Sequence, residues 1–192
     1  MDPQPAEVLQ RVVNLLDSLR IPYAVGGSYA SSIHGTARFT RDVDLVVDLA
    51  PEEVETLAAG LSPEFYVDQE AMRQAVRACD TFNAIQPEIG FKVDFFILGQ
   101  SAFDRESFGR RRAAALEESG ASIFFYAPED MVLRKLEWYR KGGEVSEQQW
   151  RDVLGILLVQ RGRLDDAYMK RWAAALGVSD LLERVTGETA AG

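Results

Sequence analysis

The chain has 192 residues, 47% hydrophobic and 27% charged, which suits one soluble globular domain or a core with a small appendage. Its net charge of -9 at pH 7 argues against a broad nucleic-acid-binding face, because such binding depends on neutralising many phosphates. The single cysteine, Cys79, excludes an intrachain disulfide and is expected to be a small core residue. With no signal segment and no apolar run of about 20 residues, we expect a cytoplasmic protein without a membrane role.

Apolar residues recur at helical spacing from Val8 to Leu19, which predicts an amphipathic helix that covers a sheet. A short buried strand then follows at 23–25. The turn after it consists of Gly26, Gly27 and Ser28, and a helix is predicted over 29–34. Such a turn is often only a turn, but glycines let backbone N–H groups approach an anion, and a helix N-terminus adds donors. This corner could therefore hold a polyphosphate.

Residues 42–48 alternate between acidic and apolar side chains, which predicts a strand with Asp42, Asp44 and Asp48 on one face. Taken alone, such a pattern is more often a solvated strand face. Two carboxylates about 6.5–7 Å apart along a strand can share a magnesium ion, which takes one or two carboxylates beside phosphate and water. A third acid, Asp94, lies in an apolar strand, where burial is costly without a partner.

The segment between these acids and beyond them predicts alternating helices and strands. A helix over 51–59 ends at Gly60, a short strand covers 65–67, and Asp68 caps a helix to residue 78. Strands 81–86 and 91–98 form a hairpin that brings Asp94 beside the 42–48 strand, with Lys92 and Phe96 on the same side. A helix over 101–108 and edge strands over 112–116 and 123–126 complete the predicted sheet region.

Only helical periodicity remains after Pro128, so we predict one domain over 1–127 and a helical subdomain over 128–192. The first expected helix covers 129–140, and the second begins at the capping pattern of Ser146. The third covers 165–176, and a last short helix is capped by Ser179. The second of these is expected to bury Leu157 and Leu158, among other apolar residues.

Lys135 lies within an apolar stripe of the first of these helices, where a lysine rarely occurs without a partner. It could extend its ammonium into water, or it could point at nucleotide phosphates. Asp152 is either its partner or part of a solvated helix face. Arg38, Thr40 and Arg41 precede the aspartates and could pair with them or with phosphate.

Three segments together resemble the signature elements of the DNA polymerase β-like nucleotidyltransferase superfamily: Val25-Gly26-Gly27-Ser28, Asp42-Val43-Asp44-Leu45 and Val93-Asp94-Phe95. Within this superfamily, the chain is similar to the small bacterial AbiEii-like branch, which includes toxin-type enzymes. This similarity rests on the segment from His34-Gly35 through Arg38, Thr40 and Asp42 to Asp44, and on Lys135 and Arg151-Asp152.

The resemblance implies an α+β fold, with a mixed, mostly antiparallel sheet flanked by helices and a C-terminal helical subdomain. It also implies Mg²⁺ as cofactor and a nucleoside triphosphate such as ATP as substrate. Asp42, Asp44 and Asp94 would be the catalytic and metal-holding residues, with Asp94 favouring deprotonation of the acceptor. The residues expected to bind the nucleotide are Gly26, Gly27, Ser28, Arg38, Thr40 and Lys135.

The first functional hypothesis is magnesium-dependent transfer of a nucleoside monophosphate to the hydroxyl of an RNA 3′ end, a protein or a small molecule, with release of pyrophosphate. The second is a non-catalytic nucleotide- or partner-binding module, acting with a cognate protein as a toxin-antitoxin component does. A purely structural domain would leave Asp94 and Lys135 unexplained. The base preference, the acceptor and the oligomeric state stay open.

Overall fold

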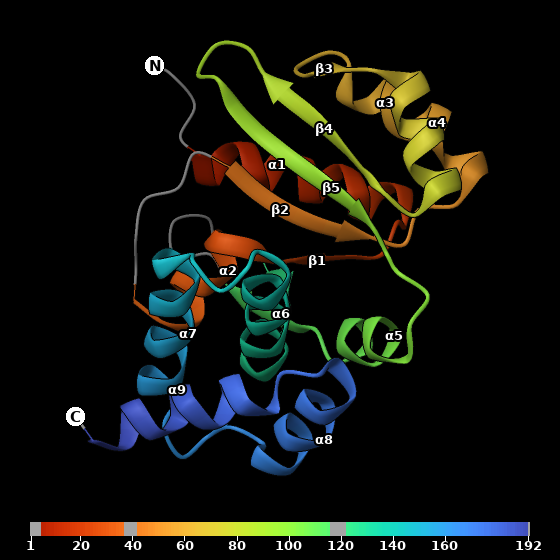
Figure 1. The fold of residues 1–192 in the computed structure, drawn as a ribbon. Coiled ribbons are helices and arrows are strands. Elements are labelled where there is room, and N and C mark those ends of the chain that lie inside the picture. The colour runs from red at the N-terminus through yellow and green to blue at the C-terminus, as the bar shows by residue number, and fades with distance from the viewer. Residues whose placement is uncertain (1–4, 37–41, 116–121, 192) are drawn as a thin grey trace. The chain divides into compact units, whose positions relative to one another are not determined.

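The computed structural model describes residues 5–36, 42–115 and 122–191 (Figure 1). The chain divides into two compact units. The first, here called the sheet unit, comprises residues 1–29 and 40–125, and the second, the helical unit, comprises 30–39 and 126–192. The domain boundary predicted after residue 127 stays a prediction.

In the described residues, the strands form one 7-stranded sheet in the order β3-β4-β5-β2-β1-β7-β6. The β2–β5 and β1–β7 pairs are parallel and the other four are antiparallel, which confirms the predicted mixed, mostly antiparallel sheet. The strands are β1 (Tyr23–Val25), β2 (Asp42–Val47), β3 (Tyr66–Val67), β4 (Thr81–Gln86), β5 (Phe91–Ile97), β6 (Arg112–Ala115) and β7 (Ser122–Phe125).

One strand lies deeper in the sheet than the sequence indicates. Both strands after residue 111 were expected at edges, but β7 lies between β1 and β6 because Val25 pairs with Phe125. The alternation of exposed and buried residues in β7 is the same for an edge strand and for an interior strand with one covered face, so the pattern could not distinguish the two.

The central strands have one apolar face and one polar face. On the apolar face Phe82 stacks on Phe95 with ring centroids 4.7 Å apart, and Leu45 lies opposite Phe95 on the next strand. Helices α1 (Pro5–Leu19) and α4 (Gln69–Ala78) pack against β5 and β4, and α1 passes behind β2 and β5 in Figure 1. The apolar face therefore forms the core, and the opposite face of the same strands carries the acids.

The other helices of the sheet unit are the start of α2 (Gly27–His34), the short 3-10 helix η1 (Pro51–Glu53), α3 (Val54–Leu61) and α5 (Ala102–Gly109). Gly60 was expected to end a helix, and α3 continues one residue further, to Leu61. A Cβ atom at residue 60 would press on the side chain of Leu15. This glycine therefore permits close packing of α3 against α1.

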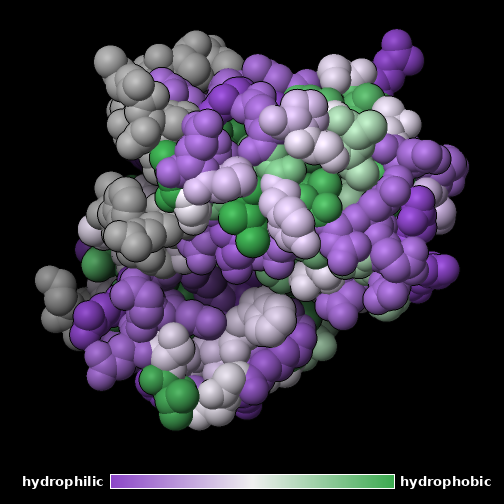
Figure 2. Space-filling model, turned by 90° about the horizontal axis from the view of Figure 1, so that it is seen from above, coloured by the Kyte–Doolittle hydropathy of each residue, from purple (hydrophilic) through white to green (hydrophobic). Residues whose placement is uncertain are grey.

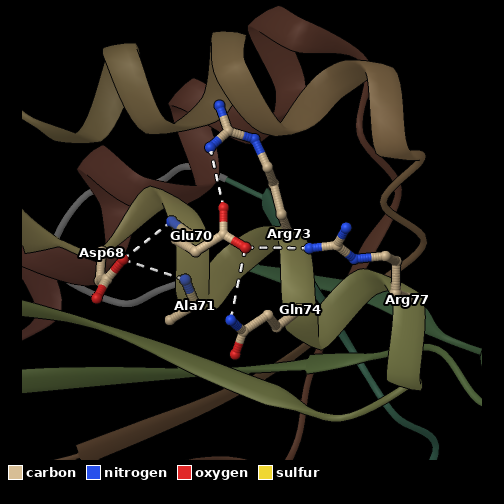
Figure 3. Close-up of polar contacts among 6 residues, drawn as sticks. All are labelled: Asp68, Glu70, Ala71, Arg73, Gln74 and Arg77. Carbon is tan, nitrogen blue, oxygen red and sulfur yellow. Dashed lines mark hydrogen bonds and ion pairs between the residues drawn. The ribbon is translucent and has the colours of Figure 1, made fainter.

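Helix α4 begins as its sequence predicts. The Asp68 carboxylate accepts hydrogen bonds from the backbone N–H groups of Glu70 and Ala71, at 2.9 and 3.1 Å (Figure 3). Cys79 ends the same helix in a left-handed conformation and is exposed, so its expected place in the core was wrong. The backbone position at the helix end, rather than the thiol's hydrophobicity, decides where this residue lies.

In its described part, the helical unit contains the end of α2 and the helices α6 (Pro128–Lys141), α7 (Glu147–Val159), α8 (Asp166–Leu176) and α9 (Ser179–Ala191). Helix α6 packs against α7, α8 and α9, and α9 also packs against α7 and α8. Buried acids in the first turn of α6 tie it to α8. Tyr168 Oη donates a hydrogen bond to Asp130 Oδ1 at 2.5 Å, and the Asp165 N–H donates to Glu129 Oε1 at 3.1 Å.

The buried stripe of α7 differs from the expected one. Val153, Ile156 and Leu157 are buried, whereas Leu158 is 52% exposed. Adjacent side chains on a helix point about 100° apart. When only one face of the helix is packed, Leu157 can point into the core while Leu158 points to solvent.

Hydrophilic residues cover most of the face seen in Figure 2, with hydrophobic side chains gathered in smaller groups between them. No helix in the described parts of the chain combines the length and the apolar character needed to cross a membrane.

Candidate active site

The glycine turn and the acidic strand meet in the sheet unit. The Gly26 N–H donates a hydrogen bond to the Asp44 carbonyl at 2.8 Å. Gly27 has φ +56°, and a Cβ atom at this position would overlap the Asp44 carboxylate. Only glycine fits there, both in backbone conformation and in space.

Helix α2 begins at Gly27, two residues earlier than expected, so Ser28 lies in its first turn. The start of a helix has N–H groups that lack intrahelical partners. The turn therefore places potential phosphate donors directly beside the Asp44 carboxylate.

The two acidic strands are neighbours, as the predicted hairpin required. Asp44 lies opposite Asp94 in the parallel β2–β5 pair, where neighbouring strands are about 4.8 Å apart. Asp42 lies on the same face, two residues before Asp44, and is opposite Lys92. The three predicted catalytic carboxylates therefore share one face of two adjacent strands.

Among the described residues, Lys92 places a positive charge in this cluster. Its Nζ lies 2.7 Å from Asp94 Oδ2. The hydrogen bond to Asp94 raises the pKa of the Lys92 ammonium, burial opposes this, and the charges of Asp94, Asp42 and Asp44 raise the pKa further. The sequence placed Lys92 on the site-facing side without giving it a role, although its spacing of two residues from Asp94 on a strand is the signal for such a contact.

Within the described residues, no group of three or more His, Cys, Asp or Glu side chains is arranged to hold a metal ion. The donor chemistry nevertheless suits Mg²⁺, which prefers oxygen ligands and usually takes one or two carboxylates together with phosphate oxygens and water. Asp44 and Asp94, on paired positions of β2 and β5, are such carboxylates.

The predicted nucleotide-binding lysine lies in the helical unit. Lys135 Nζ contacts Asp152 Oδ2 at 2.8 Å, and the two side chains are only 10% and 7% exposed. Gln148 Nε2 donates to the other oxygen of Asp152 at 2.8 Å. The ammonium is therefore not in water, and Asp152 is a buried partner rather than part of a solvated helix face.

Three predicted contacts lie outside the described residues: Arg38, Thr40 and Arg41. His34 has a structural contact, with Nε2 2.6 Å from the carbonyl oxygen of Tyr126. Since a carbonyl can only accept, this contact requires the proton on Nε2.

Solved structures provide the comparison for this geometry. The solution structure of the antibiotic-resistance factor ANT(2″)-Ia superposes with a TM-score of 0.61 at 16% identity, covering 98% of this chain and 100% of that chain. The chain has the nucleotidyltransferase fold.

Two further structures share this fold. ANT(2″)-Ia in complex with adenylyl-2″-tobramycin gives a TM-score of 0.59 at 14% identity, over 88% of this chain and 94% of that one. An antigenic nucleotidyltransferase-like protein from Paracoccidioides brasiliensis gives a TM-score of 0.55 at 20% identity, over 93% of this chain and 91% of that one. No protein-family model and no curated protein sequence matches the chain.

Proposed function

We propose that this protein is a magnesium-dependent nucleotidyltransferase that moves a nucleoside monophosphate from a nucleoside triphosphate to an acceptor hydroxyl. The observation that carries the proposal is the convergence of Asp42, Asp44 and Asp94 on one sheet face, with Asp44 against the Gly27 turn. A fold shared with nucleotidyltransferases supports it.

Each residue of the site has a role in this reaction. The acceptor oxygen forms a bond to the α-phosphorus, the bond from that phosphorus to the β-phosphate oxygen breaks, and pyrophosphate leaves. Asp94 favours removal of the acceptor's proton, and the Gly27–Ser28 turn holds the β- and γ-phosphates through N–H groups. Asp42 and Asp44, with Asp94, would hold Mg²⁺, which neutralises charge on the phosphates when bound.

Among the three acceptor classes, a small molecule is the first choice. ANT(2″)-Ia is described as an antibiotic-resistance factor, and its complex contains adenylyl-2″-tobramycin. An RNA 3′ end and a protein side chain are the alternatives. Membership of the AbiEii-like branch, with a cognate protein partner, is also proposed; the support is the contact between Lys135 and Asp152, two residues on which the resemblance rests.

Thermal unfolding with Mg²⁺ and each of the four triphosphates tests the binding half of this proposal. A ligand that binds only the native state adds about 2.7 kcal/mol at a hundredfold excess over its dissociation constant. We expect Asp42→Asn with Asp44→Asn to abolish the magnesium-dependent part of that shift. A full shift in this double variant would show that the metal assignment is wrong.

A glycine pair tests the phosphate-binding turn. Gly27 and Gly90 both have positive φ, at +56° and +61°, but nothing lies within 4 Å of a Cβ atom built at residue 90. Gly27→Ala and Gly90→Ala therefore share the backbone strain and differ in the overlap with Asp44. We expect only Gly27→Ala to lose triphosphate binding.

Transfer itself is tested with triphosphates labelled at the α-phosphate. Incubation with cell extract, followed by separation into small molecules, RNA and protein, shows which class becomes labelled. Binding without label in any fraction would favour the non-catalytic module.

A further inference from the structure

The carboxylate face contains a cation of its own. Lys92 lies on β5, two residues before Asp94 and directly opposite Asp42 on β2. Side chains alternate along a strand, so Lys92, Asp94, Asp42 and Asp44 all lie on the same side of the sheet. This arrangement places one ammonium among three carboxylates.

The ammonium contacts a carboxylate that the proposed reaction requires. Its Nζ is 2.7 Å from Asp94 Oδ2, and the charges of Asp42 and Asp44 also act on it. While Asp94 Oδ2 accepts a hydrogen bond from the Lys92 ammonium, a divalent cation cannot occupy the position of that ammonium beside the same oxygen. The two cations therefore compete for one oxygen.

We propose that Lys92 is an internal counter-cation, which holds Asp94 in the metal-free protein and must leave this carboxylate before a divalent cation binds it. The inference rests on the proposed function, because that function places the cation at Asp94. In this role Lys92 is a positioning residue, which shields the three carboxylates from one another and sets the concentration of divalent cation at which the site fills.

The Lys92 side chain is suited to such an exchange. It is 43% exposed and its partner is 20% exposed, so water can replace the contact. Lysine carries a point charge on a flexible four-carbon stem, and partly exposed ion pairs contribute little to stability. The ammonium can therefore move away from Asp94 without disturbing the strand.

Titration of the intact protein with Mn²⁺, followed by electron paramagnetic resonance of the free ion, tests the inference without any measurement of activity. Lys92→Met should bind Mn²⁺ about fivefold more tightly than the wild type, the factor that corresponds to loss of a competing pair of about 1 kcal/mol. Lys141→Met is the matched control. Lys141 contacts Glu137 at 2.7 Å, with a partner that is also 20% exposed, but it lies in the helical unit.

The control removes the same charge and an ion pair of the same length, so it reports the effect of net charge alone. We expect Lys141→Met to change Mn²⁺ affinity by less than about twofold, because the ion pair that it removes contains none of the three carboxylates of the site. A double variant tests the route of the effect. In an Asp94→Asn background, Lys92→Met should bring no comparable gain, because the competition for Asp94 no longer exists.

Thermal unfolding provides a second measurement. Without divalent cations, Lys92→Met removes the ammonium that contacts Asp94 and should lower the melting temperature, and Mn²⁺ should restore it. If the wild type binds Mn²⁺ and Lys92→Met binds it equally or more weakly, the inference is overturned while the proposed function stands. If neither protein binds Mn²⁺, even with a triphosphate present, the proposed metal site fails and the inference fails with it.

Discussion

Two lysine–aspartate pairs, one in each unit, have almost the same length and very different surroundings. Lys92 and Asp94 are 2.7 Å apart and 43% and 20% exposed, whereas Lys135 and Asp152 are 2.8 Å apart and 10% and 7% exposed. Water can take the place of either partner in the first pair, but in the second a lost partner leaves a buried charge. Burial, rather than distance, therefore decides which pair can exchange its cation and which belongs to the permanent structure.

The neighbours of the two pairs reinforce this contrast. Asp152 also accepts a hydrogen bond from Gln148, and Lys135 is flanked on α6 by the buried residues Val132 and Leu136. Lys92 instead lies on one face of β2 and β5, opposite Asp42, and its side chain is 43% exposed. The helical-unit pair is accompanied by a hydrogen bond from Gln148, while the sheet-unit pair belongs, among the described residues, to a cluster of three carboxylates and one ammonium.

The largest expected effect comes from breaking the buried pair. Asp152→Ala leaves the Lys135 ammonium buried without its carboxylate and should lower the free energy of unfolding by about 3–5 kcal/mol. Urea unfolding followed by circular dichroism measures this loss. Arg151→Ala is the control, because Arg151 forms a 2.8 Å pair with Glu147 that is 70% and 82% exposed, and it should cost at most about 0.5 kcal/mol. A loss below about 1 kcal/mol for Asp152→Ala would mean that the buried pair is not needed for stability.

Replacing both members of the buried pair sharpens the comparison. Lys135→Met with Asp152→Leu leaves no buried charge, so the double variant should recover most of the stability lost in Asp152→Ala and come within about 1–2 kcal/mol of the wild type. Triphosphate binding to this folded variant then tests the proposed role of Lys135. Loss of affinity with the fold intact supports that role, and unchanged affinity contradicts it.

Breaking the exposed pair should have a much smaller effect. Lys92→Met is expected to lower the free energy of unfolding of the metal-free protein by no more than about 1 kcal/mol, as for other partly exposed pairs. The same urea titration provides the measurement. A loss as large as that of Asp152→Ala would show that the contrast in burial has no energetic consequence.

The smallest expected effect is in the salt dependence. Raising the salt concentration to about 1 M shortens the Debye length to about 3 Å, which screens exposed charges far more than buried ones. The stability difference between the wild type and Lys92→Met should therefore shrink, whereas that between the wild type and Asp152→Ala should persist. Equal shrinkage of both differences would contradict the assignment of the two environments.

Features that depend on neighbours along the chain were predictable. The alternation of residues 42–48 indicated a strand with Asp42 and Asp44 on one side, and the hairpin predicted over 81–98 brought Asp94 to that strand, as the register confirms. Asp68 was recognised as a cap because its role depends on residues two and three positions later. The catalytic roles of these acids, and of Gly26, Gly27 and Ser28, stay predictions.

Features that depend on distant partners were not predictable. Gly60 resembles a helix stop in sequence, and α3 ends one residue after it, but only the approach of Leu15 shows why a glycine is needed there. For Asp152 the sequence left two alternatives open, a partner of Lys135 or a surface acid, and only the contact between the two side chains, 17 residues apart, decides between them. Lys92 was placed on the site-facing side from the sequence, but its position opposite Asp42, on a strand far away in the chain, appears only in the structure.

The sequence by itself determined the local elements of this protein: a glycine turn at the start of a helix, acids in strand alternation, and a helical C-terminal region. The tertiary structure decided which of these elements are neighbours, so that Asp44 lies against Gly27 and opposite Asp94, and Lys135 lies against Asp152. The physical reason is that backbone geometry fixes the spacing of side chains within one element, whereas burial of apolar surface across the whole chain selects the partners of each element.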